Sequence, residues 1–244
     1  MSAPDTHPVF RLAYVPGVTP AKWVRTWGER RRDVPLELLS CSAADGVELL
    51  TSGGAHAALL RLPVGGADEL DSIVLYRETA VAVVPTDHLL TAADEVTVAD
   101  LADEPVLHPL DDPLEWGTRP GLPVEHRPET TAEAVELVAA GVGTVVVPQS
   151  LARLYHRRDL TYRPVTDGPV SPVGLVWPAG APDELVEEFI GIVRGRTANS
   201  SRGQSDPPPK RTAREKALAK QAARAAAGKS PARRRGPDAR RGRR

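Results

Sequence analysis

The side chains that could do chemistry in this chain of 244 residues are carboxylates and hydroxyls. Asp111, Asp112 and Glu115 form an acidic loop beside Trp116, and paired carboxylates can act as general acid and base. No serine, cysteine or histidine stands in a motif that would supply a nucleophile or an oriented base. We therefore expect a solvated acidic loop, no catalytic residues and a protein that is not an enzyme.

Metal and cofactor sites are not expected either. The six histidines are scattered without an i, i+4 pair, and the single cysteine, Cys41, forms no cluster with them. One cysteine allows no disulfide within the chain, which fits a reducing cytoplasm. The G-x-G at 141–143 follows a predicted helix, whereas a phosphate cradle precedes one. We interpret it as a helix cap and turn, and we expect no cofactor and no metal.

Charge divides the chain near residue 201. Residues 202–244 hold fifteen Lys and Arg against three acidic residues, a net charge of +12, and residues 1–201 carry −13. The tail has no Val, Ile, Phe, Tyr or Trp, so it cannot bury the apolar area that offsets the entropy of folding. The sequence predicts a folded acidic body over 8–197 and a disordered basic tail over 198–244.

The tail has the chemistry of a phosphate-binding arm. A capping box at 212–215 begins a run of strong helix formers that ends near 227, and an Arg-rich arm follows. Such arms contact the phosphate backbone of DNA or RNA without reading its sequence. An alternative stays open, in which the tail docks on its own acidic body or on another acidic protein. The expected nucleic-acid-binding residues are Lys210, Arg211, Arg214, Lys216, Arg233, Arg234, Arg235, Arg240, Arg241, Arg243 and Arg244.

The elements that must position any site alternate between strand and helix. Thr19 and Pro20 are typical of an N-cap followed by the first helical residue. The alternation predicts an α/β body with a mostly parallel sheet that helices cover. Strands are predicted at 10–15, 35–40, 57–62, 73–76, 79–85, 106–108, 144–147, 160–165 and 173–177. Helices are predicted at 21–32, 45–51, 98–101, 131–140, 150–155 and 181–194.

Targeting signals are not visible in the sequence. The first ten residues lack a basic segment followed by an apolar run, so a secretory signal is not expected. No stretch approaches the 18 apolar residues that would predict a membrane span. We expect a cytoplasmic protein that does not bind a membrane.

Five stretches stand in order along residues 10–195. They are FRLAYVPGVTPAKWVRTWGER, PLELLSCSAADGVELLTSGGAHAALLRLP, TAVAVVPTDHLL with VTVADLADEPVL, TTAEAVELVAAGVGTVVVPQSLARL, and VGLVWP with the final helix. Together they resemble the effector-binding domain of LysR-type transcriptional regulators, which has the type II periplasmic-binding-protein fold. Two departures from the family pattern are expected to matter: the N-terminal winged helix-turn-helix is missing, and Ala58 or His56 stands where the third strand usually carries Asp. The basic tail has no counterpart in the usual family layout.

The resemblance implies two lobes joined by two crossover strands, with a small effector in the cleft. Lobe one would be about 8–78 and 149–197, and lobe two about 79–148. Hydroxyls and backbone N–H groups at helix starts suit a carboxylate, although a hydroxyl there can serve as an N-cap without any ligand. The matching ligand-binding positions are Pro16, Gly17, Val18, Thr19, Ser42, Pro63, Thr130, Thr131 and Pro148.

The function implied is that of a LysR-type substrate-binding module that senses a small molecule in transcriptional regulation. The tail would add nonspecific affinity for DNA or RNA. Two alternatives remain open: a partner protein that pairs with full-length LysR-type regulators, and an enzyme on the same two-lobed fold. A homodimer is also possible.

Overall fold

The computed structural model describes residues 8–65 and 69–195. Within these residues the chain forms two five-stranded sheets, ordered β2-β1-β3-β10-β4 and β7-β6-β8-β5-β9. We call the first sheet with its helices lobe 1 and the second sheet with its helices lobe 2. The tail, for which the sequence predicts disorder and nucleic-acid binding, lies outside the described residues.

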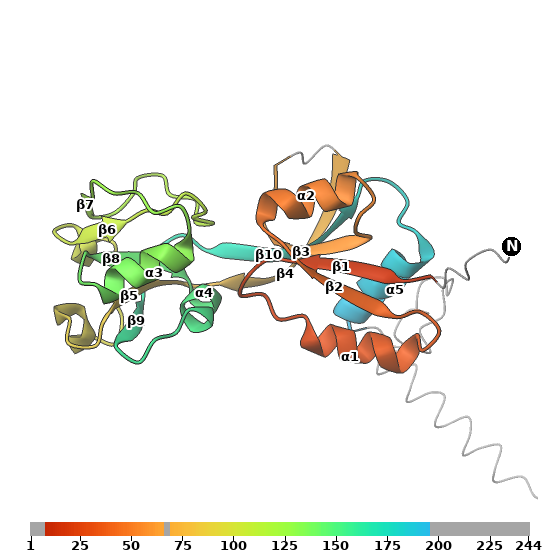
Figure 1. Cartoon of the computed structure of the whole chain (residues 1–244), viewed down its shortest axis with the longest axis horizontal. Helices are drawn as coiled ribbons and strands as arrows, with labels where there is room; N and C mark the ends of the chain where they lie inside the picture. Colours follow the sequence, from red (N-terminus) through yellow and green to blue (C-terminus); the bar gives the residue numbers. More distant parts are fainter. Residues whose placement is uncertain (1–7, 66–68, 196–244) are drawn as a thin grey trace, which may run out of the picture. The chain divides into compact units, whose positions relative to one another are not determined.

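Lobe 1 has helices on both faces of its sheet: α2 covers one face, and α1 and α5 cover the other (Figure 1). Strand β1 is parallel to β2 and β3, whereas β10 is antiparallel to β3 and β4. The elements of lobe 1 are β1 (Phe10–Tyr14), α1 (Ala21–Arg30), β2 (Leu36–Ser40), α2 (Ala43–Thr51), β3 (Ala57–Arg61), β4 (Leu70–Glu78), β10 (Ser171–Pro178) and α5 (Glu184–Val193).

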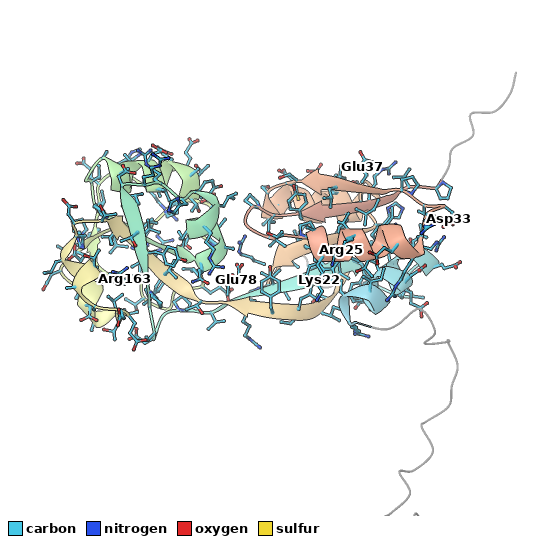
Figure 2. The ribbon with its side chains drawn as sticks, turned by 90° about the horizontal axis from the view of Figure 1, so that it is seen from below. Lys22, Arg25, Asp33, Glu37, Glu78 and Arg163 are labelled. Carbon is cyan, nitrogen blue, oxygen red and sulfur yellow. The ribbon has the colours of Figure 1, made fainter. Side chains whose placement is uncertain are left out.

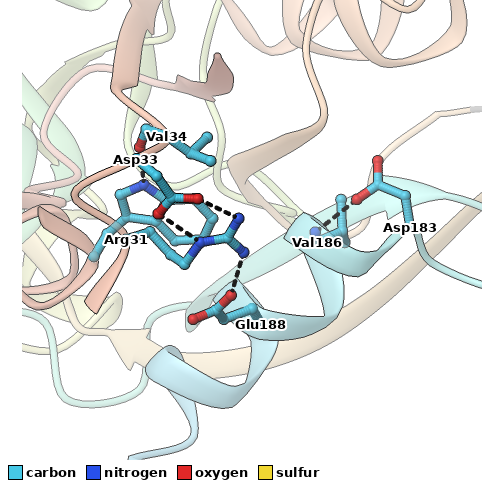
Figure 3. Close-up of polar contacts among 7 residues, drawn as sticks. Arg31, Asp33, Val34, Asp183, Val186 and Glu188 are labelled. Atoms are coloured by element: carbon cyan, nitrogen blue, oxygen red, sulfur yellow. Dashed lines mark hydrogen bonds and ion pairs between the residues drawn. The ribbon is translucent and has the colours of Figure 1, made fainter. Parts of the chain in front are cut away.

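Aromatic side chains fill the core of lobe 1 between the sheet and the helices α1 and α5. The ring of Phe10 stacks on Trp27 at 4.6 Å and meets Phe189 at 5.2 Å, and all three side chains are fully buried. Outside this cluster, Arg31 donates to Glu188 at 2.7 Å and so connects the end of α1 to α5 (Figure 3). Large rings buried together contribute more apolar area per residue than any other side chains.

Lobe 2 is built on two short strands and a central antiparallel pair, β5 and β8. Successive side chains of strand β5 lie on opposite faces of its sheet. Val81 and Val83 pack under α3 and α4, and Ala80 and Ala82 pack toward the opposite face. The elements are β5 (Ala80–Pro85), η2 (Leu89–Ala92), η3 (Ala99–Leu101), β6 (Pro105–Leu107), β7 (Leu122–Pro123), α3 (Thr131–Ala139), β8 (Thr144–Pro148), α4 (Gln149–Leu154) and β9 (Leu160–Pro164).

The expected division into lobes needs a correction. Helix α4 and strand β9 were assigned to lobe one, but β9 pairs with β5. Leu151, Ala152 and Leu160 also belong to the core of lobe 2, because their apolar side chains are buried against its valines. Lobe 1 therefore resumes only at β10, and the chain crosses between the lobes after β4 and again after β9.

The expectation of a mostly parallel sheet is also wrong. Half of the strand pairings between the named strands are antiparallel, because β10 runs opposite to both of its neighbours, and so does β5. Smaller differences concern β4, which starts at Leu70 rather than 73, and β7, which lies in a stretch expected to be loop. None of the helices in the described part of the chain is long and apolar enough to cross a bilayer.

Candidate functional site

A cavity of about 390 Å³ is lined by residues of both lobes. Lobe 1 contributes the loop after β1, the start of α2 and the end of β3. Lobe 2 contributes the loop after β6, the start of α3, and helix α4 with the residue that follows it. A volume of this size suits a small organic molecule. The lining residues are Val15, Pro16, Ser42, Ala43, Ala44, Arg61, Asp111, Pro113, Thr131, Leu151 and Tyr155.

Arg61, the last residue of β3, is a buried cation at the cavity wall, only 8% exposed. Its Nε donates to Glu78 Oε2 at 3.1 Å, its Nη1 to the carbonyl of Pro16 at 3.0 Å and its Nη2 to Ser150 Oγ at 2.9 Å. Glu78 ends the crossover strand β4 (Figure 2) and is equally buried. The guanidinium therefore ties lobe 1 to α4 of lobe 2, and its charge is compensated within the protein.

Gly17 makes room for this contact between the lobes. Its φ is +84°, a backbone conformation that favours glycine. A Cβ there would lie 2.7 Å from Ser150 Oγ and 3.0 Å from Arg61 Nη2. A side chain at this position would therefore disturb the hydrogen bond between Arg61 and Ser150 that joins the lobes.

Asp111 is the acidic group of the cavity, and its surroundings differ from those of Arg61. Its Oδ1 accepts a hydrogen bond from Thr131 Oγ1 at 2.8 Å. Within residues 8–65 and 69–195, no Lys, Arg or His makes an ion pair with Asp111. Burial raises the pKa of the Tyr155 phenol, and the Asp111 charge raises that pKa further, so Tyr155 stays a neutral hydrogen-bonding group.

The neighbouring carboxyl of Asp112 is more enclosed. Burial raises its pKa, and its hydrogen bond from the Leu114 N–H at 2.9 Å opposes that shift. The acidic loop thus has one carboxylate at the cavity and a second that points into the protein.

Two helix starts at or near the cavity are capped by hydroxyls. Ser42 Oγ accepts from the Asp45 N–H at 3.1 Å, and Asp45 Oδ2 accepts from the Ser42 N–H at 3.3 Å, a complete capping box. Thr130 Oγ1 accepts from the Glu133 N–H at 3.2 Å at the start of α3. The capping interpretation of these two hydroxyls is therefore confirmed, and Ser42 also lines the cavity.

A second cavity, of about 510 Å³, lies beside the first and shares Pro16 and Tyr155 with it. Three of the predicted ligand positions, Gly17, Val18 and Thr19, line this second cavity instead of the first. Thr19 was also predicted as the N-cap of α1, which is wrong, because Pro20 occupies that position without a side-chain cap. The lining residues are Tyr14, Pro16, Gly17, Val18, Thr19, Ser40, Ser150, Arg153, Leu154 and Tyr155.

The structure brings together only part of the predicted ligand set. Pro16, Ser42 and Thr131 line the first cavity. Three predicted positions line neither of the two cavities: Pro63, Thr130 and Pro148. Whether any of these positions contacts a ligand stays a prediction.

Sequence reasoning missed the residues that give the cavity its charge and much of its wall. Arg61 stands alone among apolar residues in strand β3, and a lone cation in a buried strand is a usable signal. Asp111 was considered only for catalysis, although a loop acid beside a cleft can equally bind a ligand. Leu151 and Tyr155 were assigned to a helix of the wrong lobe. In the described ranges, no group of three or more His, Cys, Asp or Glu side chains could hold a metal ion.

The sequence matches the LysR substrate binding domain family over residues 7–198. It is 30% identical over 159 residues to the HTH-type transcriptional regulator AlsR of Bacillus subtilis (strain 168), covering 57% of this chain and 49% of AlsR. It is 32% identical over 179 residues to the HTH-type transcriptional regulator CatR of Pseudomonas putida, covering 68% of this chain and 61% of CatR. The chain therefore spans less than two thirds of the length of either relative.

Solved structures share the fold. The BenM effector binding domain with its effector benzoate superposes with a TM-score of 0.63 at 19% identity, covering 77% of this chain and 90% of that chain. The reduced form of OxyR superposes with a TM-score of 0.62 at 22% identity, covering 78% of this chain and 96% of that chain. These likenesses confirm the predicted two-lobed α/β fold.

Proposed function

The chain belongs to the LysR substrate binding domain family, and from that premise we propose that it is a cytoplasmic small-molecule sensor in transcriptional regulation. Its relatives AlsR and CatR are transcriptional regulators, and the family is not one of enzymes. The observation that carries the proposal is the cavity of about 390 Å³ whose wall comes from both lobes. One bound molecule would contact both lobes at once.

Such a ligand can act as a signal because it favours one arrangement of the lobes over another. A ligand shifts a conformational equilibrium only through contacts that differ between the two states. Arg61 and Ser150 already join the lobes at the cavity wall. A molecule in the cavity would add to that link, and a regulator can read the change through the lobes' outer surfaces.

The test is a melting-temperature screen of the full chain against small molecules. A ligand at ~100 times its Kd would stabilise the fold by about 2.7 kcal/mol, which raises Tm by roughly 5–10 °C for a domain of this size. Ala43→Phe, at the first position of α2, would fill the cavity and abolish the shift. Ala21→Phe, at the first position of α1 and outside both cavities, is the matched control. A ligand whose shift survives Ala43→Phe binds elsewhere, and a screen without any shift would contradict the proposal.

We also propose that the basic tail binds DNA or RNA without sequence preference. The support is its charge of +12 over residues 202–244, beside a body of −13 that repels phosphate. Affinity should fall about a thousandfold or more between 50 and 200 mM salt if six to ten charges touch phosphates. Neutralising 233–235 and 240–244 should weaken all sequences alike. No binding at low salt would favour a tail that docks on the acidic body.

Two other functions compete with the sensor. A partner that pairs with full-length LysR-type regulators would co-purify with them whether or not a small molecule is present. An enzyme on the same fold would turn a substrate over. Co-purification that is independent of ligand, or turnover in the cavity, would replace the sensing function.

A further inference from the structure

The two charged groups at the cavity are in different electrostatic states. Arg61 has Glu78 as a buried counter-ion 3.1 Å away, with both side chains less than a tenth exposed. An incoming carboxylate would have to share a guanidinium whose charge Glu78 already compensates. Arg61 therefore offers an anion hydrogen bonds but little net charge.

Asp111 lines the same cavity, but within residues 8–65 and 69–195 it forms no ion pair with a Lys, Arg or His side chain. Thr131 orients the carboxylate through one hydroxyl at 2.8 Å, but a hydroxyl does not neutralise it. The rest of the wall is largely apolar, with Val15, Pro113 and Leu151 among its members. Asp111 is solvent-exposed, so its charge is screened more than that of a buried group. At the contact distance of a bound ligand, this carboxylate still favours a cation and disfavours an anion.

The helix starts do not reverse this preference. The N-terminus of a helix carries roughly half a positive charge, and α2 and α3 both begin at the cavity. Each already has an acid in its first turn, Asp45 in α2 and Glu133 in α3. Because these acids already complement the partial positive charges of the two helix starts, those partial charges attract an anion less strongly than the full charge of Asp111 attracts a cation.

We propose that the effector carries a protonated amine, or a similar cationic donor, on an apolar body, and that this group binds Asp111. The inference rests on the proposed sensing function of the same cavity. Tyr155 supports it, because this residue lines the cavity and the face of an aromatic ring attracts cations. The carboxylate expected from the sequence is replaced as the leading class of ligand.

The test compares two probes with the same ring and opposite charge, phenethylamine and 3-phenylpropanoate. Each is titrated calorimetrically into the full chain at pH 7. Phenethylamine should bind at least ~10 times more tightly, the value of one charge-assisted contact of about 1.4 kcal/mol. Asp111→Asn should remove that preference. Glu115→Gln, an acid of the same loop that lines neither cavity, should leave it unchanged.

The remaining outcomes would contradict the cationic ligand, and they show whether the sensing function fails with it. Equal or tighter binding of 3-phenylpropanoate, or an amine affinity that Asp111→Asn leaves intact, would overturn the choice of a cationic ligand and leave the sensing function standing. Failure of both probes to bind at millimolar concentration would also overturn it. Only a blank melting-temperature screen would remove the sensing function as well. Melting curves of both variants check that they fold.

Discussion

The two lobes bring opposite charges to one cavity and treat them differently. Lobe 1 buries Arg61 and surrounds it with three acceptors, one of them the carboxylate of Glu78. Lobe 2 leaves Asp111 exposed on a loop, where the Thr131 hydroxyl donates a hydrogen bond to its carboxylate. The difference separates two roles. A charge that the protein compensates holds the lobes, and a charge that it leaves open is available to a ligand.

The cores of the two lobes also differ, in the size of the side chains that fill them. Lobe 1 packs large rings, among them Phe10, Trp27 and Phe189, against its sheet. The two buried clusters of lobe 2 consist largely of Val, Ala and Leu side chains such as Val81 and Val145. A small side chain buries less apolar area than a large one. Truncating one core side chain to alanine should therefore lower the free energy of unfolding more in lobe 1 than in lobe 2.

The largest effect is expected from Phe189→Ala in lobe 1. Removing a fully buried phenyl ring should lower the free energy of unfolding by about 4 kcal/mol, because the cavity left between Phe10 and Trp27 cannot collapse completely. Val145→Ala in β8, equally buried, should cost about 2 kcal/mol. Urea unfolding of the full chain measures both. Equal losses would show that the two cores do not differ as described.

The next effect concerns the compensated charge. Glu78→Gln keeps a hydrogen-bond acceptor for Arg61 but leaves its charge buried without a counter-ion, which should cost about 3 kcal/mol. The control is Glu37→Gln, whose partner Arg11 is 45% exposed, with an expected loss below about 1 kcal/mol (Figure 2). If the two variants unfold at the same urea concentration, Glu78 is not the counter-ion that stabilises the buried charge of Arg61.

A smaller effect separates capping from ligand contact. Ser42→Ala removes the cap of α2 at the cavity, and Asp183→Ala removes the cap of α5, where Asp183 Oδ1 accepts from the Val186 N–H at 2.8 Å (Figure 3). Each should lose about 1 kcal/mol of stability. Only Ser42→Ala should also weaken the binding of a ligand that the screen identifies. Unchanged affinity would leave Ser42 as a cap alone.

The smallest effect is a pH dependence at Asp112. Its raised pKa means that the folded state favours the protonated form, so its contribution to stability is present at low pH and is lost as pH rises through the folded-state pKa. Asp112→Asn removes that loss while keeping an acceptor for Leu114. The variant's stability relative to wild type should therefore increase between about pH 3 and 7. A difference that stays flat, or falls, with pH would contradict burial as the cause.

Much of the fold follows from local sequence patterns. The continuous apolar run of β5 predicts a buried strand. The capping residues Ser42 and Thr130, and Gly141 with a φ of +77° after α3, are likewise visible in the local sequence. The lobe boundary is not, because an amphipathic helix such as α4 fits the face of either sheet. Which sheet it covers depends on the pairing of β9 with β5.

The chemistry of the site was harder to predict than the elements that carry it. Arg61 and Glu78 are 17 residues apart in the sequence, and they come together because β3 and β4 flank β10 in one sheet. Asp111 reaches the cavity through a loop whose path has no periodic signal. Hydroxyls at helix starts are visible in sequence, but which cavity each one lines depends on how the two lobes meet.

The most direct test of the account is a crystal structure of the full chain with phenethylamine bound. The account predicts the ring among Val15, Leu151 and Tyr155, with the ammonium nitrogen within hydrogen-bonding distance of an Asp111 carboxylate oxygen and with Arg61 still paired to Glu78. An amine in the second cavity near Arg153, or an amine in the first cavity turned away from Asp111, would contradict it.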